Sequence, residues 1–297
     1  MLISSLILGA LHAMVPLTIT ATGEILSERA GVVNIGLEGI LLISAFAAVV
    51  GAEAGGPLAG LMVGLLTGAL LGLIHGIIAV YFRGDQTVSG VGLNILALGV
   101  VAIGIVDRWG AAGFHRVERA FRVPPLSTPL GPMSPMVIVT ILLAALTWYL
   151  LQHTNLGLKI QACGENPAAA DAAGVRVERV RLFGAVYAGA LTGIAGAYLS
   201  IDWLATITEN LPAGRGFIAL ATVVFSRLNP WLAVLGGLIF GFFDSLGLVA
   251  STSQALTRVI PYQFIQMMPY VVTLLVVAGV IGRFRAPAAS GQPYRRE

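Results

Sequence analysis

Ionisable side chains within apolar stretches are the residues of this sequence best placed to do chemistry. Glu38, His75 and Asp244 interrupt runs of aliphatic residues, and such side chains are costly in hydrocarbon unless they serve a function. The histidines lie in four different segments, at positions 12, 75, 115 and 153. No nucleophile–base pair and no Cys/His cluster with metal-site spacing is apparent, which argues against an intramembrane enzyme and predicts no metal site. The alternative roles are structural: Glu38 and Asp244 would satisfy backbone groups at helix breaks, and His75 would make an interhelical hydrogen bond.

The segment CGENPAAADAAGVRVERVR, residues 163–181, is a polar and basic stretch between two apolar ones. Asn166 suits an N-cap, Pro167 suits the first helical position, and Gly174 is a natural C-terminal stop. The alanines between them favour a helix of about seven residues, roughly 10 Å long. Glu165 would lie at its positive end, where a carboxylate is favoured. Because so short a helix is unstable alone in water, either the base of the membrane domain or a groove in a partner must hold it.

The composition of the chain is typical of an integral membrane protein. Of its 297 residues, 57% are hydrophobic and only 10% are charged, whereas about a quarter is usual for soluble chains. Basic residues lie at segment ends rather than on one face, so no nucleic acid polymer is expected as a partner. Stretches of roughly twenty apolar residues recur, each long enough to cross a lipid bilayer as a helix, and the first lacks the basic start of a cleaved signal. The predicted spans are nine: 2–22, 34–51, 57–80, 88–106, 135–151, 182–201, 214–226, 230–250 and 263–282. The expected fold is an all-α polytopic transmembrane helical bundle, with residues 1–297 as a single domain.

Two of the predicted spans have unusual features. The span 57–80 carries glycines every four residues, at 60, 64, 68, 72 and 76, which predicts close packing against a neighbouring helix. The span 214–226 is short for a crossing, and Asn229 and Pro230 then supply an N-cap and a first-turn proline for the next helix. A half-membrane helix that turns at SRLNP is therefore expected. Broken helices are tolerated only where protein or a water-filled cavity satisfies their backbone, so this one indicates a transport core.

Arginine placement sets the expected orientation. Of the 17 Lys and Arg residues, eleven fall in predicted cytoplasmic loops and six in outer loops if the N-terminus is outside and the C-terminus inside. The loop 152–181 and the tail 283–297 are then cytoplasmic, and the loop 107–134 is extracytoplasmic, although it is itself basic. Three arginines that follow the short helix would extend toward lipid headgroups or meet acidic residues of a partner: Arg176, Arg179 and Arg181. A capped connector with a positively charged flank explains the same pattern without a partner.

Four stretches, in this order, resemble permeases of ATP-binding-cassette importers in the branched-chain amino acid, ribose and nucleoside group. They are closest to the nucleoside and simple-sugar permeases: GEILSERAGVVNIGLEGILLISAFAA (23–48), GDQTVSGVGLNILALG (84–99), GENPAAADAAGV (164–175) and AGRGFIALATVVFSRLNPWLAVLGGLIFGFFDSL (213–246). The resemblance runs over nearly the whole chain and implies a multi-pass protein of the bacterial plasma (inner) membrane. The related ribose permeases have a further N-terminal span, and its absence agrees with the expected N-out start.

In this family the short cytoplasmic helix docks into a cleft on an ATPase subunit. The resemblance implies a set of ATPase-coupling residues at this helix: Glu165, Asn166, Ala169, Ala170 and Gly174. The chain has no Gly-Lys-Ser/Thr motif, because its sole lysine, Lys159, stands between Leu158 and Ile160. No cofactor is therefore expected in this chain, and ATP and Mg²⁺ are expected in the partner ATPase. The resemblance also implies a second, homologous permease subunit and an extracytoplasmic substrate-binding lipoprotein.

The outer loop 107–134 is the candidate landing surface for the lipoprotein. Arg116, Arg119 and Arg122 recur every three residues, which would cluster them on one face of a helical turn. Such a face would pair with acidic residues of the binding protein and steer its approach. A surface that is simply solvated, or that touches lipid headgroups, is the alternative.

The expected function is that of the permease subunit that forms the nucleoside path of such an importer. A nucleoside needs hydrogen bonds to its ribose and base and an apolar surface for stacking, and four residues offer these contacts: Glu38, Ser89, Asn94 and Phe217. A simple sugar such as ribose or galactose is the nearest alternative substrate, because the family motifs do not fix it. An ion-coupled secondary transporter would need carboxylates near the bilayer midplane, and Asp244 is the one convincing candidate. That reading also leaves the capped alanine helix unexplained.

Overall fold

The computed structural model describes residues 2–110, 113–129, 131–252 and 285–295, together with the isolated positions 264, 267, 271 and 274. The predicted span 263–282 lies outside these residues apart from the isolated positions. Within the described chain, six helices are long and apolar enough to cross a membrane: α1 (Leu2–Arg29), α2 (Leu37–Gly76), α3 (Gln86–Trp109), α4 (Met136–His153), α7 (Val177–Tyr198) and α9 (Pro230–Thr252). The expectation of a polytopic helical bundle is confirmed.

Shorter elements connect these helices. Three short helices are α5 (Asn155–Glu165), α6 (Pro167–Ala172) and α8 (Arg215–Phe225). Two π-helical turns, η1 (Ile77–Tyr81) and η3 (Leu199–Trp203), extend α2 and α7, and η2 (Arg119–Phe121) is a 3₁₀ turn. Short strands form two antiparallel pairs: β1 (Phe114–Arg116) with β4 (Thr206–Thr208), and β2 (Leu126–Thr128) with β3 (Gly131–Met133).

Helix α2 turns back on itself and accounts for two of the predicted spans. Its backbone leaves the helical region at Gly55 (φ −147°, ψ 16°) and Gly56 (φ 84°, ψ 177°). The two arms then lie against each other, because a Cβ built on Gly60 would lie 2.7 Å from the carbonyl oxygen of Ala48. The positive φ at Gly56 is one that glycine adopts without strain. The first arm, 37–54, is about 27 Å long at 1.5 Å per residue, close to the thickness of a bilayer core.

The predicted glycine stripe packs against α7. A Cβ on Gly72 would lie 2.5 Å from the carbonyl oxygen of Ala185, and a Cβ on Gly64 would lie 2.7 Å from the Cβ of Ala197. Only residues without a side chain allow two helix backbones to approach this closely. The prediction that these glycines serve helix packing is therefore confirmed, and α7 is the partner.

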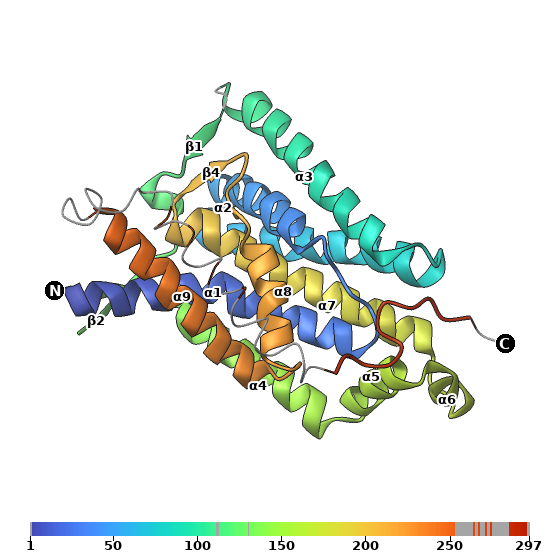
Figure 1. Cartoon of the computed structure of the whole chain (residues 1–297). Helices are drawn as coiled ribbons and strands as arrows, with labels where there is room; N and C mark the ends of the chain where they lie inside the picture. The colour runs from blue at the N-terminus through green and yellow to red at the C-terminus, as the bar shows by residue number, and fades with distance from the viewer. Residues whose placement is uncertain are drawn as a thin grey trace.

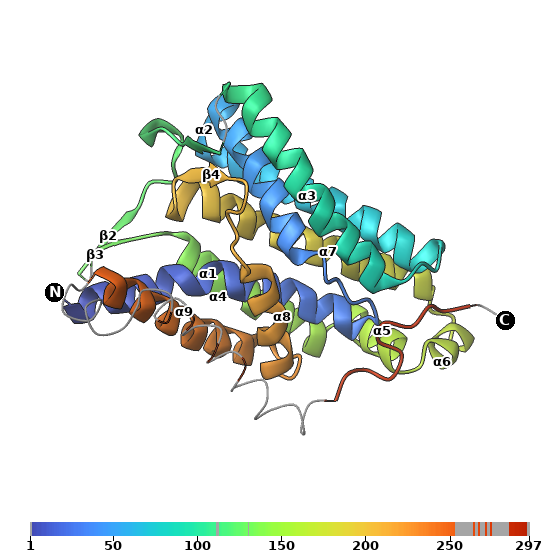
Figure 2. The same ribbon diagram turned by 45° about the horizontal axis from the view of Figure 1, so that its top comes forward.

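The spanning helices form two groups that meet along α1 and α7. Figure 2 shows α2, α3 and α7 on one side and α1, α4, α8 and α9 on the other, and α1 packs on both α7 and α9. Buried side chains from both groups share one core, with Met14, Leu41, Val101 and Tyr198 among its members. The outer faces of the helices stay apolar, as expected where lipid replaces water: Ile103 of α3 is 72% exposed.

Helix α8 is the expected half-membrane helix. It has 11 residues and ends at Phe225, and the chain then turns through Arg227 (φ 51°) and Leu228 (φ 59°), both in the left-handed region. The Asn229 side chain accepts a hydrogen bond from the backbone N–H of Trp231 at 3.0 Å, so the predicted N-cap of α9 is confirmed. The guanidinium of Arg29, the last residue of α1, donates to the carbonyl oxygen of Leu228 at 3.2 Å and so ties this turn to the C-terminal end of α1.

One end of the bundle carries α5, α6 and the C-terminal segment 285–295, which lie together beyond the ends of α1 and α7 (Figure 1). Arg181 was expected to reach lipid or a partner, and that expectation is wrong. Its side chain is 2% exposed and its guanidinium donates to the carbonyl oxygens of Gln292 (2.7 Å), Ala289 (3.3 Å) and Cys163 (3.4 Å). A buried guanidinium needs such acceptors, and here they fasten the C-terminal segment to α5 and α7.

Candidate functional site

A cavity of about 320 Å³ opens where α8 begins. Its lining comes from α2, α3, the loop that precedes α8, and α8 itself: Glu38, Gly39, Leu42, Asn94, Leu98, Asn210, Pro212, Gly214 and Phe217. Three of the four predicted path residues, Glu38, Asn94 and Phe217, therefore converge on one cavity. Its volume lies at the lower end of the range for small-molecule sites, and its lining mixes apolar groups with a few polar ones, as such sites do.

Glu38 closes the N-terminal end of α8. Its Oε1 accepts a hydrogen bond from the N–H of Gly214 at 2.6 Å, and its Oε2 accepts one from the N–H of Gly216 at 2.7 Å. Gly214, the residue before α8, offers no side-chain cap, so the carboxylate of α2 satisfies donors that would otherwise be unpaired inside the membrane. Glu38 has the structural role that the sequence left open, at the wall of the cavity.

Asn94 holds the N-terminal end of α2 in the same way. Its Oδ1 accepts from the N–H of Gly39 at 2.7 Å, and its Nδ2 donates to the carbonyl oxygen of Ile35 at 3.1 Å. The amide of α3 thus fixes the loop that leads into α2. Because both ends of the amide are engaged, Asn94 shapes the cavity wall and keeps little hydrogen-bonding capacity for a ligand.

Asn210 and Phe217 are the residues of the lining that remain available to a ligand. Asn210 is exposed, and its amide has no hydrogen-bond partner among the described residues. The Phe217 side chain, on the first turn of α8, is 50% exposed. An amide that both donates and accepts, beside an open aromatic ring, can recognise a planar polar molecule by hydrogen bonding and stacking.

Ser89 does not line this cavity. Its hydroxyl lies 3.0 Å from Nδ1 of His75, and Nε2 of His75 lies 3.1 Å from the carbonyl oxygen of Val33. His75 is fully buried, so this pair joins α2, α3 and the loop after α1. The interhelical hydrogen bond that the sequence offered as the alternative role of His75 is confirmed.

Asp244 is engaged in an ion pair. Its carboxylate lies 3.2 Å from Arg215, the first residue of α8, and the Arg215 guanidinium also lies 5.0 Å from the ring centroid of Trp203. A second guanidinium nitrogen of Arg215 donates to the carbonyl oxygen of Pro212 at 3.2 Å. These contacts hold the loop before α8 between α9 and η3. Asp244 therefore anchors the broken helix. Separately, the described residues contain no group of three or more His, Cys, Asp or Glu that could hold a metal ion.

Helix α6 is the short alanine helix that the sequence predicted. The Asn166 Oδ1 accepts from the N–H of Ala169 at 3.0 Å, Pro167 is the first helical residue, and Gly174 (φ 84°) ends the turn that follows. Four of the five expected coupling residues are exposed: Glu165, Asn166, Ala169 and Gly174. Ala170 is 4% exposed and packs in the core cluster that α1 and α7 share.

The expectation that Ala170 contacts another subunit is therefore corrected, because its methyl group faces the chain's own interior. Glu165 also differs from the sequence reading. It is the last residue of α5, and its Oε2 accepts from the N–H of Ala288 at 3.4 Å. Helix α5 itself was predicted only as part of a loop. Its buried Cys163 is the one cysteine, and burial raises the pKa of this thiol to about 11.

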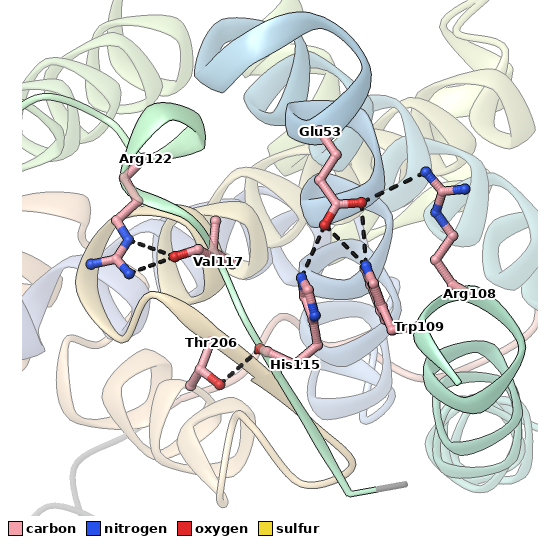
Figure 3. Close-up of polar contacts among 7 residues, drawn as sticks. All are labelled: Glu53, Arg108, Trp109, His115, Val117, Arg122 and Thr206. Atoms are coloured by element: carbon pink, nitrogen blue, oxygen red, sulfur yellow. Dashed lines mark hydrogen bonds and ion pairs between the residues drawn. The ribbon is translucent and has the colours of Figure 1, made fainter. Parts of the chain in front are cut away.

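A polar cluster ties α2, α3 and β1 together (Figure 3). The Glu53 carboxylate, beside the Gly55–Gly56 turn, accepts from Nε1 of Trp109 at 3.0 Å and lies 3.0 Å from Nε2 of His115 and 3.7 Å from Arg108. The rings of Trp109 and His115 stack with centroids 4.2 Å apart. His115 belongs to β1, whose partner β4 leads directly into the loop that lines the cavity.

The three arginines of the loop 107–134 do not share a helical face, contrary to the prediction. Arg116 lies on β1, Arg119 begins the 3₁₀ turn η2, and the Arg122 guanidinium folds back onto the carbonyl oxygen of Val117 (Figure 3). Strand pairing with β4 extends the chain here, so the spacing of three no longer places the side chains together. Arg116 and Arg119 remain exposed.

Comparison with known proteins assigns the chain to a family. The family described as "Branched-chain amino acid transport system / permease component" matches residues 6–279. The chain belongs to this family. No solved structure matches the chain.

Three relatives resemble this permease over nearly its whole length. The guanosine ABC transporter permease protein NupQ of Bacillus subtilis is 38% identical, and the alignment covers 99% of this chain and 97% of the relative. The nucleoside ABC transporter permease protein NupC of Lactococcus lactis is 36% identical over 94% and 93%. A putative glucose ABC transporter permease protein of Haloferax volcanii is 30% identical over 99% and 98%. The chain is thus a multi-pass permease of the bacterial plasma (inner) membrane.

Sequence reasoning missed two features of the permease site. Asn210 stands two residues before Pro212 in a short polar stretch, ITENLP, and that stretch was the available signal. The Glu53 cluster had no such signal, because its members come from three separate segments that only the fold brings together.

Proposed function

We propose that this permease forms the translocation path for nucleosides in an ATP-binding-cassette importer, and that the cavity at the start of α8 is part of that path. The observation that carries this proposal is the convergence of the open ring of Phe217 and the free amide of Asn210 on one cavity of about 320 Å³. Stacking and amide hydrogen bonds are the two contacts that a nucleobase uses. The printed functions of two near-full-length relatives, guanosine and nucleoside transport, support the same substrate class.

The energy for transport comes from a separate ATPase subunit that docks at the exposed side of α6 and binds ATP and Mg²⁺. A second, homologous permease subunit completes the path, and an extracytoplasmic substrate-binding lipoprotein delivers the nucleoside to the outer loop near Arg116 and Arg119. The sequence without a P-loop, the capped helix α6 and the family membership support this arrangement. An ion-coupled carrier finds less support, because the Asp244 carboxylate is held by Arg215.

The test is uptake of radiolabelled guanosine by cells that carry the importer with variants of this permease. Phe217→Ala removes the ring and should lower the transport efficiency about tenfold, because base–aromatic stacking is worth about 1–3 kcal/mol. Asn210→Ala removes the amide and should lower it up to about tenfold, because a hydrogen bond is worth about 0.5–1.5 kcal/mol. Matched controls are Phe242→Ala, another half-exposed phenylalanine, and Asn155→Ala, another exposed asparagine, neither of which lines the cavity.

Unchanged uptake in both cavity variants would refute the assignment of the cavity to the path. Competition separates the substrate classes: excess unlabelled adenosine should suppress uptake, whereas excess ribose, galactose or glucose should not. Suppression by a sugar alone would instead favour the simple-sugar alternative, which the putative glucose permease among the relatives represents.

A further inference from the structure

A second cavity, of about 360 Å³, lies at the end of the permease that carries α6, and three arginines are part of its lining. Its walls come from η1 and the turn after it, from the start of α7, and from the C-terminal segment: Val80, Tyr81, Arg83, Arg176, Glu178, Arg179 and Tyr294. Three arginines against one glutamate give it a formal charge of +2. This cavity is separate from the one at the start of α8.

The arginine side chains of this cavity have no ion-pair partner among the residues that the structure describes. The guanidinium groups of Arg83, Arg176 and Arg179 make no hydrogen bond or ion pair with any residue that the structure describes, and all three residues are exposed. Like charges that line one cavity repel each other, and the repulsion is relieved when an anion binds between them. The planar guanidinium is the side chain that best matches phosphate oxygens.

The start of α7 adds to the same preference for an anion. Arg176 is the residue before this 22-residue helix, and no side chain caps its first turn. The first N–H groups of α7, including those of Glu178 and Arg179, therefore carry the partial positive charge of a helix N-terminus at the wall of the cavity. Backbone donors and three guanidinium groups together form an arrangement that suits a phosphate.

The surroundings indicate that the phosphate belongs to a lipid. Tyr81 is 50% exposed and Phe82 is 76% exposed, and both stand directly before Arg83 at the end of a spanning helix. Val88, on the first turn of α3, is 70% exposed. Aromatic and basic residues side by side are typical of the membrane–water interface, with apolar surface below them for acyl chains. A soluble anion would bind the arginines without contacting the exposed apolar side chains of Tyr81, Phe82 and Val88.

We propose that the cavity between η1 and the start of α7 binds the phosphate of an anionic phospholipid from the cytoplasmic leaflet. The headgroup enters between Arg83, Arg176 and Arg179, and the acyl chains run along the apolar surface beside Phe82 and Val88. One wall of the cavity, Tyr294, donates a hydrogen bond to Asp171 of α6 at 3.0 Å. The bound lipid thus lies one side chain away from α6.

The experiment measures lipid binding to the purified full chain by native mass spectrometry, with phosphatidylglycerol and zwitterionic phosphatidylcholine as probes. The parent chain should retain one phosphatidylglycerol in preference to phosphatidylcholine. Each arginine removed should weaken that binding about fivefold, so the variant R83Q/R176Q/R179Q should lose the preference. The matched control K159Q/R227Q/R285Q removes three exposed basic residues that do not line the cavity, and it should bind as the parent does.

If the triple variant does not fold, the single variant Arg179→Gln replaces it, once size exclusion shows that it is monodisperse. Its preference for phosphatidylglycerol should fall about fivefold. A preference for phosphatidylglycerol that survives in both variants overturns the proposal. Inorganic phosphate or AMP that displaces phosphatidylglycerol at equal concentration overturns the lipid source and assigns the site to a soluble phosphate. Loss of co-purifying ATPase in the triple variant with unchanged lipid binding also overturns it, and assigns the arginines to that subunit.

Discussion

At the scale of single residues, Glu38 shows how a charged side chain is retained in an apolar chain. Its two oxygens accept from Gly214 and Gly216, so the carboxylate replaces the cap that α8 does not provide for itself. The sequence offered two roles for Glu38, in the substrate path and at a helix break; the structure confirms the second, and the first stays a proposal. The partners could not be predicted, because they lie about 180 positions away along the chain.

The variant Glu38→Gln tests this cap directly. A glutamine keeps the length of the side chain but replaces one acceptor by an NH₂ group, so one of the two N–H groups loses its partner. Because a hydrogen bond to a charged group is worth about 1.5–3 kcal/mol, amide exchange at Gly214 and Gly216 should become at least tenfold faster. Hydrogen–deuterium exchange with mass spectrometry of the peptide that spans 212–220 measures it. A peptide from α4 should exchange at the parent rate, and an unchanged rate at 212–220 would contradict the capping role.

At the scale of elements, the sequence predicts those that local chemistry decides. The caps Asn166 and Asn229 and the stop at Gly174 are short-range, and α6 and the break before α9 follow from them. Strand pairing of β1 with β4 joins segments about ninety residues apart, and no local pattern revealed it. The buried guanidinium of Arg181 was mispredicted for the same reason, since its acceptors belong mostly to the distant C-terminal segment.

The contact between α2 and α7 gives a second element-scale prediction. Gly72→Ala puts a methyl group 2.5 Å from the carbonyl oxygen of Ala185, and overpacking of this kind costs about 1–3 kcal/mol. The thermal midpoint of the purified chain should therefore fall. Gly92→Ala is the matched control, because a Cβ there meets nothing within 4 Å and alanine is the better helix former by about 1 kcal/mol. Its midpoint should stay or rise. Equal midpoints for both variants in a detergent melting assay would show that the stripe does not govern packing.

At the scale of the whole molecule, the cavity lies between two surfaces that other subunits are proposed to use. At one end of the bundle, β1 carries Arg116 and pairs with β4, which continues into the cavity loop at Asn210. At the other end, α6 is fastened through Tyr294 and the C-terminal segment to α7 and to the end of α1. Helix α1 packs against α7, α8 and α9, so packed elements connect the proposed ATPase contact at α6 with the broken helix.

The exposed side of α6 decides whether this route is used. Ala169→Arg adds a long charged side chain on the surface that the ATPase is proposed to cover, whereas Ala170→Leu overfills the interior of the permease itself. Ala169→Arg should lower nucleoside-stimulated ATP hydrolysis of the assembled importer at least about tenfold and leave the thermal midpoint of the isolated chain unchanged. Ala170→Leu should lower that midpoint, because buried overpacking is destabilising. Ala286→Arg, at another exposed alanine, in the C-terminal segment, is the control and should change neither quantity. Full ATPase stimulation in Ala169→Arg would place the ATPase contact elsewhere. A cleft of the ATPase that closes on the backbone of α6 has no room for an arginine side chain at this position.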